Sequence, residues 1–318
     1  MADAPDLAIF SPALVLLVEL EQDAEGRLEV HLHPGGQGYW VARMARALGG
    51  RPVLCAPVGG EAGGVVADLL KREGVTLRSV PMKGDSGTYI HDRRDGERRI
   101  ALEAPPPALG RHVLDQLFSI TLAAGLEAGV AVVAGTQAST VVRPKTYERL
   151  VSDLVQTGVH VVVDVSGDLL RPALAGRPPM LKISHEELIA DGWARDGSLS
   201  EVASSIDALQ REGATDVVVS RAEEPAVASV GGELVEVVVP ELRVVDHRGA
   251  GDSMTAGLAI GAIRGLPAHE TLALAAAAGA LNVTRHGLAS GHDETIAQLA
   301  LRVQIRRCAS TTARRNRA

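Results

Sequence analysis

The chain has few aromatic side chains. Its 318 residues include only two Phe, two Trp and three Tyr. Because 46% of the residues are hydrophobic, the chain can still bury a sizeable core, which excludes disorder as its main state. That core must be built from Ala, Val and Leu. Such small residues favour a parallel β-sheet covered by Ala-rich helices.

Cysteine is also scarce, since Cys55 and Cys308 are the only two. They fit neither a disulfide framework nor a zinc site, and they suit a reducing cytosol. Basic residues are not in excess, because 32 Lys and Arg stand against 39 Asp and Glu, a formal net charge of −7. This balance argues against nucleic acid as a partner.

Long hydrophobic runs are missing. The longest, such as 272–281, are too short and too rich in Ala to span a bilayer, so we expect no membrane contact. Asp3 and Asp6 stand where a signal peptide needs positive charge. We therefore expect a cytoplasmic protein. The basic segment 306–318 lacks apolar periodicity and is expected to be a flexible tail, or else a weak contact for an anionic polymer.

What the chain does contain is an alternation of apolar strands and helical patterns. Short apolar runs, at 52–58 and 130–134 among others, alternate with helical periodicity at 145–157 and 200–212. Such alternation indicates βαβ units and a largely parallel sheet. The other strands expected in this region are 75–80, 159–165, 179–183, 216–220, 226–230 and 234–239, and the other helices include 110–127, 185–191, 251–264 and 268–285.

Two segments outside this rhythm predict a second, small β element. Residues 7–33 contain strands with alternating apolar and polar residues, and 85–103 contains two strands flanking Asp95-Gly96, a dipeptide that favours a type I′ hairpin turn. A small sheet that is apolar on one face needs a partner to cover it. The expected boundaries are 34–84 and 104–305 for an α/β core, and 7–33 and 85–103 for a small β lid.

The sharpest local feature is a glycine turn, Gly249-Ala250-Gly251, that follows an apolar segment and opens a helix. Glycines let backbone N–H groups converge there, and the helix N-terminus adds partial positive charge. Together they make an anion hole suited to a phosphate. Asp252 stands beside it, where a carboxylate is suited to general-base chemistry. Taken alone, the pattern also fits a tight turn with an acidic cap.

Two further segments point to a ligand site. Residues 35–38 (Gly-Gly-Gln-Gly) form a second glycine turn before a helix, which is either a tight crossover or a backbone approach to a polar substrate. Glu186 and Glu187 follow the strand 179–183, and ligands bind at strand ends of open α/β sheets. Glu187 could hold a metal-bound water, although both carboxylates also suit a helix N-terminus.

In their order along the chain, these features resemble the PfkB (ribokinase-like) carbohydrate kinase family, most of all its 1-phosphofructokinase and tagatose-6-phosphate kinase branch. The resemblance covers nearly the whole chain. Gly249-Ala250-Gly251-Asp252-Ser253 matches the family's anion-hole motif without change. The other similar segments are Ser11-Pro12-Ala13-Leu14, 34–43 (Pro-Gly-Gly-Gln-Gly-Tyr-Trp-Val-Ala-Arg), Asp164-Val165-Ser166-Gly167 and 182–187 (Lys-Ile-Ser-His-Glu-Glu).

The resemblance implies a three-layer α/β/α domain with a mostly parallel central sheet and a small β-sheet lid. It also implies an ATP- and Mg²⁺-dependent kinase that phosphorylates a hydroxyl of a sugar or sugar phosphate. Asp252 would accept the hydroxyl proton, the N–H groups of 249–252 would stabilise the moving phosphoryl group, and Glu187 would hold Mg²⁺ through water. In this branch the lids of two subunits can cover each other, which implies a homodimer.

The resemblance assigns the remaining site residues to two groups. Those at the ATP site are Lys182, Ser184, Ser220, Arg221, Asn282 and Gly287. Those at the acceptor site are Val15, Gly35, Gly36, Gln37, Gly38, Trp40 and Asp252.

The acceptor side departs from the family pattern. The family's Asp, Lys, Asn and Arg contacts are replaced by Val15, Gln37, Trp40 and Gly87 respectively. Each charge-assisted hydrogen bond lost is worth ~1.5–3 kcal/mol. We therefore expect fructose 1-phosphate and fructose 6-phosphate to be poor substrates.

Other side chains offer two ways to compensate. His91, Arg93 or Arg94 could supply the missing positive charge from the lid. Alternatively, a larger and less polar acceptor could stack on Tyr39 and Trp40, unless both rings simply pack in the core.

The nucleotide side departs as well. The family's Ser-x-Gly-x-x-Gly loop has no glycine here, at 220–225 (Ser-Arg-Ala-Glu-Glu-Pro), and Pro225 lacks an N–H donor. Ser184 replaces the family's Asn, while Arg221 could compensate in part. Two functions therefore stay open beside an active sugar kinase: a catalytically weak or inactive ligand-binding or regulatory homologue on the same fold, and a nucleoside kinase.

Overall fold

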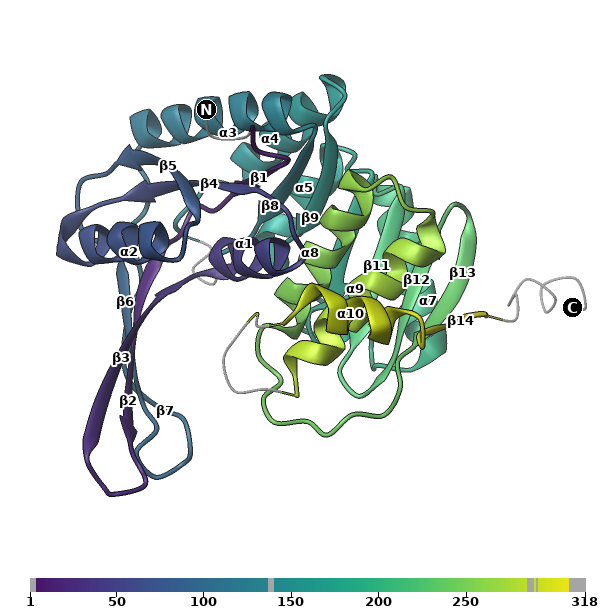
Figure 1. Cartoon of the computed structure of the whole chain (residues 1–318). Coiled ribbons are helices and arrows are strands. Elements are labelled where there is room, and N and C mark those ends of the chain that lie inside the picture. The colour runs from purple at the N-terminus through teal and green to yellow at the C-terminus, as the bar shows by residue number, and fades with distance from the viewer. Residues whose placement is uncertain (1–3, 137–139, 285–288, 290, 309–318) are drawn as a thin grey trace, which may run out of the picture.

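The computed structural model describes residues 4–136, 140–284, 289 and 291–308. Two β-sheets form its framework (Figure 1). The large sheet has ten strands in the order β14-β13-β12-β11-β10-β9-β8-β1-β4-β5, and the small sheet, the lid, has four in the order β3-β2-β6-β7.

The large sheet is mostly parallel. The strands from β11 to β5 in the order above run parallel, and β12, β13 and β14 continue the sheet antiparallel to their neighbours. The strands are β1 (Leu7–Phe10), β4 (Pro52–Val58), β5 (Thr76–Pro81), β8 (Val130–Ala134), β9 (His160–Asp164), β10 (Met180–Ser184), β11 (Asp216–Arg221), β12 (Glu224–Val230), β13 (Glu233–Val238) and β14 (Gln304–Arg307).

Helices cover both faces of this sheet and pack on it through two separate apolar clusters. One face carries α1 (Gln37–Ala47), α2 (Gly60–Arg72), α8 (Ala250–Ile263), α9 (Ala268–Asn282) and α10 (Asp293–Ala300). The other carries α3 (Arg111–Ala128), α4 (Pro144–Gln156), α5 (Leu170–Ala175), α6 (His185–Ala190) and α7 (Leu199–Glu212). This arrangement confirms the predicted three-layer α/β/α fold. None of the helices in the described residues is long and apolar enough to cross a membrane.

Strand β1 corrects the expectation that 7–33 lies wholly in the lid. All four of its residues are fully buried, and it pairs with β4 on one side and β8 on the other. Four consecutive apolar residues need a sheet that is covered on both faces, which the lid cannot provide. The chain leaves the core for the lid only after Ser11 and Pro12.

The lid is built from two hairpins that extend away from the body (Figure 1). Its strands are β2 (Val15–Gln22), β3 (Leu28–Gly35), β6 (Gly87–Asp92) and β7 (Arg99–Ala104), and the parallel pair β2–β6 joins the two hairpins. The turn at Asp95-Gly96 is present but is not type I′, because only Gly96 has positive φ (83°). A register shift opposite Ile90 and His91 accompanies it.

The C-terminal end of the described chain differs from the expected tail. Arg306 and Arg307 belong to β14, which pairs with Glu236 and Val235 of β13. This four-residue strand was not predicted, because a short, polar edge strand carries almost no periodicity. Residues 309–318 of the expected tail lie outside the described residues.

The topology reverses at β1, and this reversal places the site. From β1 the chain builds outward through β4 and β5, and it then returns to build β8, β9, β10 and β11 on the opposite side. Such a reversal leaves a crevice outside the carboxyl ends of the central strands, where ligands bind in open α/β sheets. The lid hairpin β2–β3, the start of α1 and the loop after β8 all meet there.

Helices α8 and α9 approach each other closely because small residues line their contact. A Cβ atom on Gly257 would lie 2.5 Å from the Cα atom of Ala275, and one on Gly261 would lie 2.5 Å from Cγ2 of Thr271. The contact therefore leaves no room for even one added methyl group.

We predict that Gly257→Ala destabilises the protein by about 1–3 kcal/mol, because the two helix backbones must separate. Urea unfolding measures the change. The matched control is Gly64→Ala on the exposed side of α2, where a Cβ atom meets nothing within 4 Å and the higher helix propensity should add up to about 1 kcal/mol. Equal effects at both positions would contradict the close helix contact.

Candidate active site

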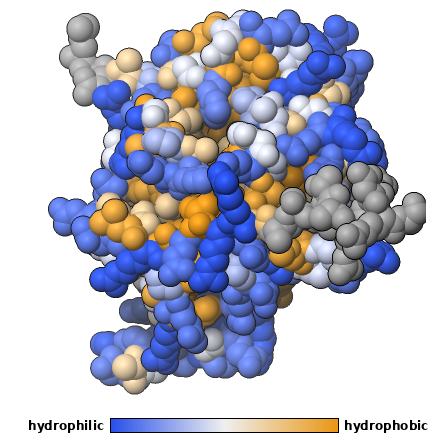
Figure 2. Space-filling model, turned by 90° about the vertical axis from the view of Figure 1, so that its right-hand side faces the viewer, coloured by the Kyte–Doolittle hydropathy of each residue, from blue (hydrophilic) through white to orange (hydrophobic). Residues whose placement is uncertain are grey.

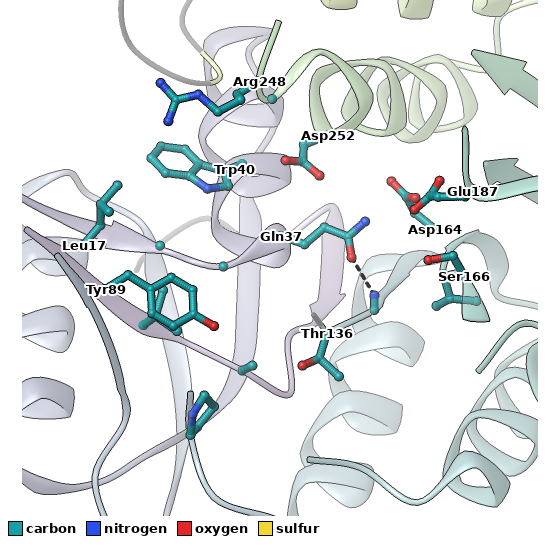
Figure 3. A pocket seen from close by; sticks show the side chains of 18 of the residues that line it. Leu17, Gln37, Trp40, Tyr89, Thr136, Asp164, Ser166, Glu187, Arg248 and Asp252 are labelled. Atoms are coloured by element: carbon teal, nitrogen blue, oxygen red, sulfur yellow. Dashed lines mark hydrogen bonds between the residues drawn. The ribbon is translucent and has the colours of Figure 1, made fainter. Parts of the chain in front are cut away.

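A cavity of about 410 Å³ lies between the lid and the core at the crevice beside β1. Figure 3 shows that its two sides differ in chemistry. The carboxylates of Asp164, Glu187 and Asp252 gather on one side, and the side chains of Trp40, Tyr89 and Leu17 lie on the other. The cavity thus combines an acidic end with a partly aromatic wall contributed by α1 and the lid.

Helix α8 begins at the acidic end of the cavity. Gly249 caps it in the left-handed conformation (φ 74°), and the Ser253 N–H group donates to the Gly249 carbonyl at 2.9 Å. The N–H groups of the first turn before Ser253 have no partner within the helix. Gly249 and Asp252 both line the cavity, so a phosphate placed there would meet these donors and the positive end of the helix dipole.

Asp252 is only partly exposed, and its surroundings favour the neutral form. Burial and the neighbouring Asp164 carboxylate raise the pKa of Asp252 to about 7, against the opposing effect of Lys182. A carboxyl group with a pKa near neutrality can accept a proton efficiently from a bound hydroxyl group.

A buried ionic network lies directly beneath the start of α8. Lys182 on β10 is 5% exposed and Asp164 on β9 is 2% exposed. The Lys182 Nζ atom lies 3.4 Å from Asp164 Oδ1, and the Thr255 hydroxyl donates to Asp164 Oδ2 at 2.5 Å. A Cβ atom on residue 251 would lie 2.5 Å from Lys182 Nζ. Glycine at 251 therefore lets the ammonium group sit against the anion-hole turn.

Glu187 is held by a capping box at the N-terminus of α6. Its Oε2 atom accepts from the N–H and hydroxyl groups of Ser184 at 2.8 and 2.9 Å, and its own N–H donates back to Ser184 Oγ. Although burial opposes ionisation, Lys182 and these hydrogen bonds hold the pKa of Glu187 below its ordinary value. The interpretation of Glu187 as a helix N-terminal residue is confirmed by this capping box. Glu187 also lines the cavity, and its role at a metal-bound water stays a prediction.

The donor set suits Mg²⁺ bound partly through water. Mg²⁺ keeps several waters and uses one or two carboxylates together with substrate phosphates. Glu187 and Asp164 offer such carboxylates on the cavity wall, whereas no three His, Cys, Asp or Glu side chains in the described residues are grouped to hold a metal by themselves.

Gln37 and the neighbouring rings shape the middle of the cavity. The Gln37 Oε1 atom accepts from the N–H of Gly135 at 2.7 Å, which leaves its amide nitrogen facing the cavity (Figure 3). Trp40 lines the cavity, but Tyr39 is fully buried and donates its hydroxyl group to Glu73 at 2.6 Å. The suggested stacking surface of Tyr39 and Trp40 is therefore wrong for Tyr39. The aromatic rings that line the cavity are those of Trp40 and Tyr89.

Comparison with known proteins identifies the family. Residues 13–295 match the model of the pfkB family carbohydrate kinases. The chain belongs to this family. The match spans the lid, the cavity and the anion-hole turn, and it confirms the resemblance found in the sequence.

Similarity to individual curated proteins is moderate but covers most of each chain. The chain is 27% identical over 303 residues to the 1-phosphofructokinase of Bacillus subtilis, covering 93% of this chain and 97% of that protein. It is 29% identical over 269 residues to the ATP-dependent 6-phosphofructokinase isozyme 2 of Escherichia coli, covering 83% and 82%.

Solved structures show the same fold. Phosphofructokinase-2 from Escherichia coli, in complex with potassium, superposes with a TM-score of 0.82 at 24% identity, covering 94% of this chain and 99% of that one. Arabidopsis thaliana ribokinase, complexed with ribose and ATP, superposes with a TM-score of 0.72 at 19% identity, covering 94% and 99%.

Among the described residues, those that the pfkB resemblance assigns to ATP do not line this cavity. Ser184 and Ser220 are neighbours at the ends of β10 and β11. Arg221 is buried, and its guanidinium group donates to the carbonyl groups of Gly197 and Pro225 at 3.0 and 3.2 Å. The guanidinium group of Arg221 is thus hydrogen-bonded to backbone carbonyl groups. None of these contacts compensates for the glycines that are missing from 220–225.

Asn282 and Lys182 are also engaged inside the protein. The Asn282 side chain donates to the Arg248 carbonyl at 2.6 Å and accepts from the Ala289 N–H at 2.7 Å, which ties the end of α9 to the segment before α8. Lys182 is enclosed by the network with Asp164 described above. Gly287 lies outside the described residues.

Most residues expected at the acceptor site do line the cavity. Gly38 does not, because it packs on Ser11, and a Cβ atom there would lie 2.5 Å from the Ser11 Cβ atom. Ala250 and Gly251 form the first turn of α8 without lining the cavity. The expected acceptor-site residues that line it are Val15, Gly35, Gly36, Gln37, Trp40 and Asp252.

Sequence analysis did not assign several cavity residues of the lid and loops. One of them is Tyr89, which lies on β6 two residues before His91, the lid residue considered above as a cation, and both line the cavity. The two-residue period of a strand was therefore the signal available for Tyr89. Arg98 and Arg248 also line the cavity, and no sequence motif pointed to them. Of the other lid cations considered, Arg93 pairs with Glu19 and Arg94 with Asp92, and neither lines the cavity.

We predict that Lys182→Met lowers the free energy of unfolding by about 3–5 kcal/mol, because it leaves the buried Asp164 carboxylate without its cation. Denaturant unfolding measures the loss. The double variant Lys182→Met with Asp164→Asn should regain most of it, since the amide carries no charge and its oxygen can still accept from Thr255. Unchanged stability with lost affinity for Mg-ATP would instead place Lys182 at the nucleotide.

Proposed function

We propose that the protein catalyses ATP-dependent phosphoryl transfer to a hydroxyl group of a sugar or sugar phosphate. Membership of the pfkB family supports a carbohydrate kinase, and the position of Asp252 supports an active one. Its carboxyl group lines the cavity beside the first turn of α8, with a pKa of about 7. ATP as the donor would place this activity in the cytoplasm.

In this proposal the acceptor hydroxyl group lies against Asp252, with the terminal phosphate of ATP at the start of α8. Asp252 takes the hydroxyl proton as the alcohol oxygen attacks the terminal phosphorus of ATP, and the bond between that phosphorus and the bridging oxygen breaks to release ADP. The N–H groups at 249–252 donate to the oxygens of the moving phosphoryl group, where charge develops. Mg²⁺, held through water by Glu187, would neutralise the phosphates when bound. The lid excludes water and so limits hydrolysis of ATP.

The acceptor is expected to differ from that of the curated relatives. Val15, Gln37 and Gly87 offer no charged group, and the side-chain oxygen of Gln37 already accepts a hydrogen bond from the N–H of Gly135. Fructose 1-phosphate and fructose 6-phosphate therefore stay predicted as poor substrates. Trp40 and Tyr89 favour a nucleoside or another flat acceptor as the second candidate, because a ring can stack on an aromatic side chain.

An inactive homologue is the competing function from another class. Two features of the segment 220–225 favour it. The segment has no glycine, and its Arg221 side chain is hydrogen-bonded to backbone carbonyl groups. Titration calorimetry with Mg-ATP separates the two functions. Binding followed by transfer to a sugar, sugar phosphate or nucleoside supports the kinase, whereas no measurable binding supports the inactive homologue.

We predict that Asp252→Asn lowers the transfer rate by about 10²–10⁴-fold, the usual contribution of a general base. In the unchanged protein, kcat should rise with pH through about 7 and level off above it, because Asp252 must be ionised to accept a proton. Steady-state assays from pH 5.5 to 9 measure both effects.

The control is Asp293→Asn, the same change in the first turn of α10 and far from the cavity lining, which should leave kcat unchanged. Asp252→Asn should not lower Tm at pH 8. Because the pKa of Asp252 is raised from 3.8 to about 7 on folding, its ionisation lowers the stability of the fold as pH rises between these two values, and the full loss is present at pH 8. An amide does not ionise and so avoids this loss. A full rate in Asp252→Asn would remove this residue from the mechanism.

We further propose that the lids of two copies pair in a homodimer. Across the lid, one row of apolar side chains runs through the register pairs Leu32–Val18, Val18–Ile90 and Ile90–Leu102. The same face continues to Val30, which is 62% exposed. Figure 2 shows the lid protruding below the body with a mostly hydrophilic surface on the side seen there. Because directly paired residues of neighbouring strands lie on the same face of a sheet, the row of apolar residues belongs to one face of the lid.

We predict that Val30→Asp shifts the protein from dimer to monomer, because a carboxylate in the centre of a dry contact would lose its water. Analytical ultracentrifugation measures the mass. The control is Leu126→Asp, another exposed apolar position, on α3, which should leave the dimer intact. A monomer before any substitution would refute the pairing.

A further inference from the structure

The end of α9 holds the segment that leads into the anion-hole turn. The carbonyl group of Val283 accepts hydrogen bonds from the N–H groups of Val245 and Asp246 at 2.7 and 3.2 Å. The Asn282 side chain donates from Nδ2 to the carbonyl oxygen of Arg248 at 2.6 Å. Three hydrogen bonds thus fasten the approach to the turn to one end of α9.

The orientation of the Asn282 amide group is fixed by two partners. Its Oδ1 atom accepts from the N–H group of Ala289 at 2.7 Å, while its Nδ2 atom donates to Arg248. A flipped amide would place N–H against N–H and oxygen against oxygen, so one orientation alone satisfies both contacts. Asn282 is 1% exposed, and a hydrogen bond is stronger in such a dry environment than in water. The Arg248 carbonyl therefore has a well-defined and strong donor.

The Arg248 carbonyl belongs to the same peptide unit as the N–H group of Gly249. A trans peptide unit is planar, and its C=O and N–H bonds point in opposite directions. Holding the carbonyl oxygen on the side of α9 therefore directs the Gly249 N–H group to the other side. Gly249 lines the cavity, and its N–H group has no hydrogen-bond partner among the described residues. This donor is thus left for a ligand in the cavity.

A donor on a carbonyl group also strengthens the N–H group of the same peptide unit, because hydrogen bonds in series polarise one another. Thr255 does not act in this way on the next part of the turn. Its hydroxyl group lies 3.1 Å from the Gly251 carbonyl oxygen, but its single hydrogen is directed to the carboxylate of Asp164 at 2.5 Å. Among the side chains of the described residues, Asn282 is therefore the one that gives its hydrogen to a carbonyl group at 248–251.

We propose that Asn282 is a positioning residue of the anion hole, which acts through the peptide unit of Arg248 and Gly249 and sets the direction and strength of the Gly249 N–H donor. The inference rests on the proposed function in one respect, that the group bound at this turn is the terminal phosphate of ATP. The pfkB resemblance assigned Asn282 to the nucleotide itself, whereas its contacts place it behind the turn and outside the cavity lining. Its loss should weaken the contact with the terminal phosphate and leave the acceptor unaffected.

Binding without an acceptor tests this role independently of turnover. Calorimetry compares the Mg²⁺ complexes of ADP and AMP-PNP, a nucleotide that carries a terminal phosphate and resists transfer. We expect the unchanged protein to bind AMP-PNP about tenfold more tightly than ADP. Asn282→Leu, which is similar in size but has no donor, should lose most of this preference. Asn282→Ser, whose side chain is too short to reach Arg248, should lose it as well and avoids the bulk of Leu in a buried place.

Steady-state kinetics give a second readout. Removing one donor of an oxyanion hole costs roughly 10²–10³-fold in kcat. Because Asn282 directs and strengthens such a donor without being one, Asn282→Leu should lower kcat by about 10–100-fold and leave the KM of the acceptor unchanged. A general loss of structure would change both constants.

The matched control is Gln210→Leu. The Gln210 amide group also donates to a backbone carbonyl, that of Thr215 at 2.7 Å, and it lies near the end of α7 away from the cavity lining. This variant should change neither the preference for AMP-PNP nor kcat. Equal effects of Gln210→Leu and Asn282→Leu would overturn the positioning role. An unchanged protein that binds AMP-PNP no better than ADP would overturn it as well.

The same measurements separate the positioning role from the proposed function. A preference for AMP-PNP that depends on Asn282, without transfer to any acceptor, would support the role and refute the kinase. Transfer at the full rate by Asn282→Leu would support the kinase and refute the role.

Discussion

The buried ion pair between Lys182 and Asp164 is the constraint on which the site depends. It joins β9 to β10, and Thr255 extends it to α8. Because both charges are removed from water, the pair is stable only if its geometry is held closely. The same ammonium group occupies the space beside Gly251. The position of the anion-hole turn is therefore set by the core of the sheet rather than by a loop alone.

This network also explains how three carboxylates can share one end of a small cavity. Lys182 attracts Asp164, Glu187 and Asp252 at once, and it holds the pKa of Glu187 down while burial holds that of Asp252 up. Two carboxyl groups in the same cavity thereby differ in protonation near neutral pH. Such a separation suits one group to a permanent charge and the other to proton transfer.

The sequence predicted the fold well because its signals are local. Buried runs such as Val130–Ala134 and the glycine turn at 249–251 each require one local structure. The site was predicted only where a motif existed. Arg221 was assigned to the nucleotide, but its contact with Gly197 depends on a loop 24 residues earlier in the chain. Arg98 became visible only through the pairing of β6 with β7, which no periodicity in the sequence encodes.

The lid strands serve two surfaces with alternate residues. On β2, Leu17 faces the cavity and Val18 faces the apolar row, and on β6 Tyr89 and Ile90 divide in the same way. Because side chains alternate strictly along a strand, inserting or deleting a single residue would exchange the two surfaces. Variation in the length of these strands is thus restricted to steps of two, and the register shift opposite Ile90 and His91 is a place where an odd residue can be absorbed without that exchange.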